Sequence, residues 1–132
     1  MITFTNVTKT YPDGTVAVDD LTLEVPEGTL AVFVGPSGCG KTTSMRMINR
    51  MIDPTSGTLT VDGKDVTTVD AVKLRLGIGY VIQSAGLMPH LRVVDNVATV
   101  PVLRGESRRS ARKSAIGVLE RVGLDPKLAD RY

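Results

Sequence analysis

The run GPSGCGKT at positions 35–42 allows very few folds. It fits the pattern G-x-x-x-x-G-K-[ST] without a mismatch. Glycines in such a loop let successive backbone N–H groups point at one anion, and a helix that begins there adds its positive dipole end. The lysine supplies a mobile charge to terminal phosphates, and the threonine hydroxyl is a ligand for Mg²⁺. The run therefore predicts a phosphate-binding loop in which Lys41 and Thr42 carry the chemistry.

The residues around this loop have the pattern that the motif requires. The apolar run LAVFV at 30–34 is typical of a strand that is covered on both faces. Residues 41–52 favour a helix, and Asp53-Pro54 should end it because proline disfavours a helical residue before it. A strand, a glycine-rich loop and a helix in this order are the structural context of the motif.

The rest of the chain is expected to mix short strands and helices. Alternating apolar residues and turn residues such as those at 12–14 and 62–63 indicate an antiparallel strand region before and after the loop. Strands are expected at 15–18, 21–25, 58–61 and 78–82, and helices at 70–76, 93–103, 107–122 and from Asp125 onward. Ser107 is expected to cap the start of its helix, and Gly123 is expected to follow its end.

Composition excludes several other classes of protein. With 42% hydrophobic and 23% charged residues in 132, the chain is typical of one globular domain. Sixteen basic and 14 acidic residues give a net charge of +2, which makes no electrostatic case for nucleic-acid binding. The single cysteine, Cys39, excludes an intrachain disulfide. No apolar run approaches the roughly 20 residues of a membrane helix, and no signal peptide is visible, so we expect a cytoplasmic protein.

The loop motif alone does not separate transporter ATPases from small GTPases, nucleotide kinases or helicases. Tyr11 precedes a Pro-Asp-Gly turn, where its ring can stack on a purine, although an aromatic residue that only fills a strand surface is the alternative. Gln83 follows a predicted buried strand, where a neutral amide can orient Mg²⁺ or water, although a glutamine there is often structural.

Together, these residues make the chain resemble the ATP-binding subunit of an ABC transporter over its whole length. Tyr11 matches the aromatic residue that stacks on adenine in that family, and GPSGCGKTT at 35–43 is the family's form of the loop. The run DPTSG at 53–57 matches the turn after the loop helix, and Gln83 matches the Q-loop glutamine, which contacts Mg²⁺ and senses the membrane partner. The resemblance implies ATP and Mg²⁺ as cofactors. It implies catalytic roles for Lys41 and Gln83 and metal binding by Thr42 and Gln83, with nucleotide contacts from Tyr11, Gly35, Ser37, Gly38, Cys39, Gly40, Lys41, Thr42 and Thr43.

The resemblance also implies the fold and its limits. We expect an α/β fold, a P-loop NTPase-type core sheet with an N-terminal antiparallel β-layer, in residues 1–83, and an incomplete helical subdomain in residues 84–132. No Ser-Gly-Gly run is present, Asp62 is followed by Gly63 rather than by a catalytic glutamate, and His90 lies in the segment after Gln83. We therefore expect a truncated domain that binds nucleotide but does not hydrolyse it alone.

A narrower resemblance concerns the transported substrate. Asn49-Arg50, VIQSAGLMPH at 81–90 and DNV at 95–97 are similar to ATPases that import glycine betaine, carnitine, choline and related osmoprotectants. An importer ATPase for an amino acid or phosphonate, and a non-catalytic nucleotide-binding half-domain, are the alternatives. The family implies a second ATP-binding subunit as a homodimer partner, permease subunits that contact the segment after Gln83, an indirect link to a substrate-binding protein, and no nucleic acid. It also implies a position at the inner face of the cell membrane.

Overall fold

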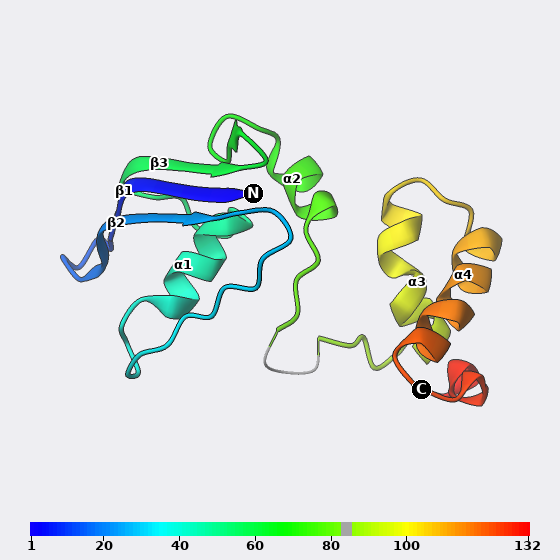
Figure 1. Ribbon diagram of the computed structural model, residues 1–132. Coiled ribbons are helices and arrows are strands. Elements are labelled where there is room, and N and C mark those ends of the chain that lie inside the picture. Colours follow the sequence, from blue (N-terminus) through cyan, green and yellow to red (C-terminus); the bar gives the residue numbers. More distant parts are fainter. Residues whose placement is uncertain (83–85) are drawn as a thin grey trace. The chain divides into compact units, whose positions relative to one another are not determined.

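A computed structural model describes residues 1–82 and 86–132 (Figure 1). The chain divides into two compact units, Met1–Gly79 and Tyr80–Tyr132. The boundary expected between residues 83 and 84 stays a prediction, because Gln83, Ser84 and Ala85 lie outside the described residues. Among the described residues, no helix has both the length and the apolar character needed to cross a membrane.

The first unit is built on an antiparallel sheet with the order β2-β1-β3-β4. Its strands are β1 (Ile2–Thr10), β2 (Val16–Val25), β3 (Ser56–Val61) and β4 (Lys64–Asp65). Helix α1 (Lys41–Ile48) lies against one face of the sheet, and α2 (Ala71–Gly77) follows β4 in the chain (Figure 1). Phe4 pairs with Leu23 on one side and with Leu59 on the other, and the buried Phe4, Leu59 and Met47 join the sheet to α1 in one core. The expected antiparallel layer and the hairpin turn at 62–63 are confirmed.

Helix α1 is shorter than the sequence predicts. It ends at Ile48 because Arg50 adopts a left-handed conformation, with φ of 52°, and its N–H donates to the Met47 carbonyl. The next N–H, of Met51, donates to the Arg46 carbonyl, which completes a Schellman-type end. The side chain of Arg50 then bonds the Val69 carbonyl at 2.6 Å, a long-range contact that the local pattern does not reveal.

Two predicted strands are wrong. Neither 30–34 nor 78–82 belongs to the sheet described within residues 1–82 and 86–132. Leu30 and Val34 are 91% and 89% exposed, and Val81 is 96% exposed. A strand forms only where a neighbouring backbone completes its hydrogen bonds. The apolar pattern therefore indicates which segments suit a buried sheet but does not supply their partners.

The second unit is helical. It contains α3 (Val93–Leu103), α4 (Arg108–Arg121) and the 3-10 helix η1 (Pro126–Asp130). Ala98, Ala111 and Ala115 are buried in its core, and their small side chains let α3 and α4 pack closely. Ser107 caps α4 by accepting the Ser110 N–H at 3.2 Å, and Gly123 has a φ of 77° just beyond it, so both caps are confirmed. Asp125 caps η1, but this segment forms a 3-10 helix rather than an α-helix.

Candidate nucleotide site

The glycines of the loop are required by its backbone. Gly38 and Gly40 have φ of +84° and +87°, a region that residues with a Cβ adopt only with strain. A Cβ on Gly40 would also lie 2.3 Å from the Ala17 carbonyl oxygen of β2. Gly40 therefore allows the loop to lie directly against the β1–β2 hairpin.

Lys41 closes the loop with its side chain. Its Nζ donates to the carbonyls of Gly35 and Pro36, both at 2.7 Å, and lies 3.3 Å from Cys39 Sγ. The ammonium thus lies inside the curve of the loop, bound to neutral acceptors. A phosphate oxygen is a stronger acceptor for this ammonium than a carbonyl, because it carries a negative charge and the carbonyl oxygen is neutral.

The start of α1 adds backbone donors to the same place. Gly40 is the N-cap, and among the described residues no side chain accepts a hydrogen bond from the first turn and no acidic residue lies in it. Unpaired N–H groups and the helix dipole favour an anion at such an end. Thr42 is exposed and Thr43 is half-buried in this first turn.

A cavity of about 410 Å³ opens beside the loop within the first unit. Its lining includes Val18 and Leu21 of β2, Phe33 of the segment before the loop, and Cys39, Lys41 and Ser44. The lining is mainly apolar and carries two charged side chains, the ammonium of Lys41 next to the loop and the carboxylate of Asp19 on β2.

Tyr11 lies at the turn between β1 and β2, in the hairpin that contacts the loop. Its N–H donates to the Thr15 carbonyl at 2.8 Å, and its own carbonyl accepts the Gly14 N–H at 2.9 Å. The strand that returns from this turn carries Ala17, which lies against Gly40. Lys9 Nζ lies over the Tyr11 ring, 5.5 Å from its centroid. Lys9 is not among the predicted site residues, and its closeness to Tyr11 in the sequence is the one local signal for this contact.

The structure thus places most of the predicted site residues along one continuous segment. Gly35, Ser37, Gly38, Cys39 and Gly40 form the loop, and Lys41, Thr42 and Thr43 begin α1. Tyr11 lies on the hairpin that packs against this loop, and Gln83 lies outside the described residues. Their roles stay predictions.

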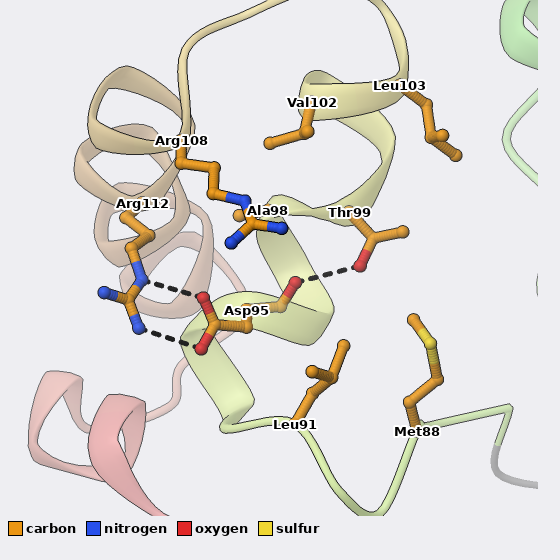
Figure 2. Close-up of a pocket in the computed structure, with 9 residues that line it drawn as sticks. All are labelled: Met88, Leu91, Asp95, Ala98, Thr99, Val102, Leu103, Arg108 and Arg112. Carbon is orange, nitrogen blue, oxygen red and sulfur yellow. Dashed lines mark hydrogen bonds and ion pairs between the residues drawn. The ribbon is translucent and has the colours of Figure 1, made fainter.

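The helical unit contains a second hollow, a pocket of about 400 Å³ between α3 and α4 (Figure 2). Arg112 binds both carboxylate oxygens of Asp95 at 2.8 Å, and this hydrogen bonding lowers the pKa of Asp95 below its usual value. Arg108 also lines the pocket, whose remaining lining is largely apolar. This pair could not be predicted from local sequence, because Asp95 is on α3 and Arg112 is on α4.

Solved structures identify the class of protein that has this fold. One match is the dimeric structure of MJ0796, described as a bacterial ABC transporter cassette. The match covers 99% of this chain and 61% of the MJ0796 chain, with 30% sequence identity and a TM-score of 0.87. The same protein with bound ADP and Pi matches equally well. The fold is that of an ABC ATPase cassette, which confirms the predicted α/β P-loop NTPase class.

The family follows from the sequence. The ABC transporter family matches residues 18–132, and this chain belongs to that family. It is 48% identical over its whole length to a carnitine transport ATP-binding protein, OpuCA of Listeria monocytogenes, and 43% identical to a choline transport ATP-binding protein, OpuBA of Bacillus subtilis. It spans 33% and 35% of those two proteins, about a third of their length.

Proposed function

We propose that this chain binds MgATP as part of the energy-coupling ATPase subunit of an importer. The observation that carries the proposal is the loop at 35–42. Lys41 Nζ donates hydrogen bonds to its carbonyls, beside the start of α1, where no side chain caps the helix. A triphosphate would accept hydrogen bonds from the ammonium and from the free N–H groups at the same time. Hydrolysis belongs to the whole subunit, and we expect none from this chain alone because it has no Ser-Gly-Gly run and its only histidine is His90.

The residues present also suit Mg²⁺. This ion prefers oxygen ligands and usually takes only one or two from the protein, with the rest from phosphates and water. Thr42 offers an exposed hydroxyl beside the loop, and the amide of Gln83 is the second proposed ligand. When bound, Mg²⁺ would neutralise charge on the terminal phosphates.

Replacing Tyr11 by alanine tests the base-binding half of the proposal. We expect the Tyr11→Ala variant to bind MgATP about tenfold more weakly, since base stacking on an aromatic ring contributes about 1–3 kcal/mol. Isothermal titration of Mg-tripolyphosphate, which has no base, should give the wild-type dissociation constant. Tyr132→Ala is the matched control, because Tyr132 lies in the other unit and is 79% exposed. Equal weakening for both ligands would contradict a stacking role.

Glycine betaine, choline and carnitine are the proposed substrates of the importer. The support is the printed function of the relatives, which include a glycine betaine uptake system ATP-binding protein of Escherichia coli at 39% identity. An amino acid is the alternative substrate, since the chain is also 41% identical to a glutamate transport ATP-binding protein of Corynebacterium glutamicum. A second ATP-binding subunit is the proposed dimer partner, supported by the dimeric cassette structures. The proposed location is the cytoplasmic face of the membrane.

The pocket between α3 and α4 is the proposed docking site for a cytoplasmic helix of the permease. Through the permease, the ATPase would be linked indirectly to the substrate-binding protein. Met88 and Leu91 bring the segment after Gln83 to this pocket, and Leu103, 66% exposed, lies at its edge. Arg112 is paired with Asp95, whereas the guanidinium of Arg108 makes no hydrogen bond or ion pair within the described residues and acts on Asp95 only through its charge (Figure 2). An apolar lining with one such guanidinium suits a partner helix that presents an apolar side chain and a carboxylate.

Charge reversal at Arg108 tests this docking site. We expect Arg108→Glu in the full ATPase subunit to weaken its binding to permease-containing vesicles about tenfold, because a carboxylate would then face a carboxylate. Co-sedimentation is the measurement. Arg109→Glu is the matched control, since this substitution changes the charge by the same amount but Arg109 does not line the pocket. Equal losses in both variants, or equal binding to protein-free anionic vesicles, would contradict the proposal.

A further inference from the structure

We propose that Lys9 is a positioning residue for the nucleotide base, which holds the Tyr11 ring so that one of its faces is presented to adenine. This inference rests on the proposed binding of ATP and on the stacking role of Tyr11. It adds a residue outside the phosphate loop to the proposed site. It also gives the turn that follows α1 a role, which is to hold Lys9 in place.

The contacts of Lys9 are specific. Lys9 is the next-to-last residue of β1, and Tyr11 follows the end of the strand at Thr10. Lys9 Nζ donates to the Asp53 carbonyl at 2.8 Å and lies over the Tyr11 ring, 5.5 Å from its centroid. The Lys9 residue as a whole is half-buried. The ammonium thus lies over one face of the ring, and a base that stacks on Tyr11 would use the opposite face.

The carbonyl that holds Lys9 is itself fixed. Thr55 N–H donates to the Thr8 carbonyl at 2.8 Å, and Thr10 N–H donates to the Thr55 hydroxyl at 3.0 Å. The Asp53 carboxylate accepts from Arg50 Nε at 3.0 Å. The turn at 53–55 is thus attached to β1 and also to Arg50.

This turn connects the two parts of the proposed site. Arg50 follows α1, and α1 begins at the phosphate loop, so a continuous set of contacts runs from the loop helix through Asp53 and Lys9 to Tyr11. The base-stacking ring is consequently held relative to the element that binds the phosphates. Such preorganisation favours binding because less side-chain freedom is lost when the base arrives.

The test compares ligands with and without a base. Lys9→Met keeps an apolar stem but removes the charge, and we expect it to weaken MgATP binding about fivefold, the upper end for an exposed cation–π contact. Mg-tripolyphosphate binding should not change, and Lys9→Arg should restore MgATP affinity. Lys64→Met is the control, because Lys64 is an exposed lysine of the same unit on β4. Isothermal titration of the purified chain gives all dissociation constants.

A double variant separates positioning from a general structural effect. If Lys9 acts through Tyr11, then Lys9→Met should have no further effect on MgATP binding in a Tyr11→Ala background. Additive losses, equal weakening of tripolyphosphate, or no change in Lys9→Met would overturn this inference and leave the proposed function standing. A wild-type chain that does not bind MgATP would overturn the proposed function and this inference with it.

Discussion

Replacing Lys41 by methionine is expected to weaken MgATP binding at least tenfold. In the structure its ammonium lies inside the loop, bound to the carbonyls of Gly35 and Pro36. A phosphate oxygen would replace these neutral acceptors, and a hydrogen bond to a charged group contributes about 1.5–3 kcal/mol, which corresponds to about 10- to 150-fold in affinity. Isothermal titration of the wild-type chain and the variant measures the change.

Stability should change little in the same variant. Gly35 and Pro36 are exposed, so their carbonyls can turn to water when the ammonium is removed. Lys73→Met is the matched control, since Lys73 is an exposed lysine of α2 in the same unit. A Lys41→Met variant that keeps wild-type affinity for MgATP would contradict the assignment of the loop. A variant that unfolds would show that the lysine serves mainly to hold the loop together.

Replacing Gly57 by alanine is expected to have the largest effect on the fold of the first unit. Gly57 lies near the start of β3 with φ of +81°, and a Cβ there would lie 2.2 Å from the Asn6 carbonyl oxygen and 2.6 Å from Val7 Cα. Because all these atoms belong to the backbone of β1, the methyl group fits only if β1 and β3 separate. We expect the free energy of unfolding to fall by about 3 kcal/mol or more, the sum of left-handed strain and overpacking. Urea unfolding followed by far-ultraviolet circular dichroism measures it.

Gly63 offers a matched control for this prediction. Its φ of +74° is nearly the same, but a Cβ there would have no atom within 4 Å. The free energy of unfolding of Gly63→Ala should therefore fall only by the cost of the left-handed conformation, about 1–2 kcal/mol. If both variants lost the same amount, backbone strain alone would explain Gly57 and the close approach of β1 to β3 would have no energetic role.

Much of the local structure was predictable because short-range chemistry determines it. Ser107 caps α4 through an N–H three residues away, and Asp62-Gly63 forms the turn between β3 and β4. Each feature depends on groups that are close in the sequence, so a pattern of a few residues suffices. A helix from Asp125 onward was predicted for the same reason, although the structure has a 3-10 helix there, with Asp125 as its cap.

The errors have one physical origin. The apolar runs at 30–34 and 78–82 have the composition of buried strands, but a strand needs hydrogen bonds from another segment, and none is paired with them in the described parts of the chain. The end of α1 was misplaced for a related reason. Arg50 tolerates a left-handed backbone where its side chain reaches Asp53 and the distant Val69 carbonyl.

Consecutive residues were enough to predict the glycine-rich loop at 35–40 and the helix that follows it, and this motif together with Tyr11, the run at 53–57 and Gln83 indicated the family. The surroundings of the loop depend on the tertiary structure. The contact of Lys9 with Asp53 joins residues 44 apart, and that of Asp95 with Arg112 joins residues 17 apart on two helices. Gly40 lies against Ala17 for the same reason. Such contacts depend on how the chain folds back on itself, and no local spacing of residue types specifies which distant groups will meet.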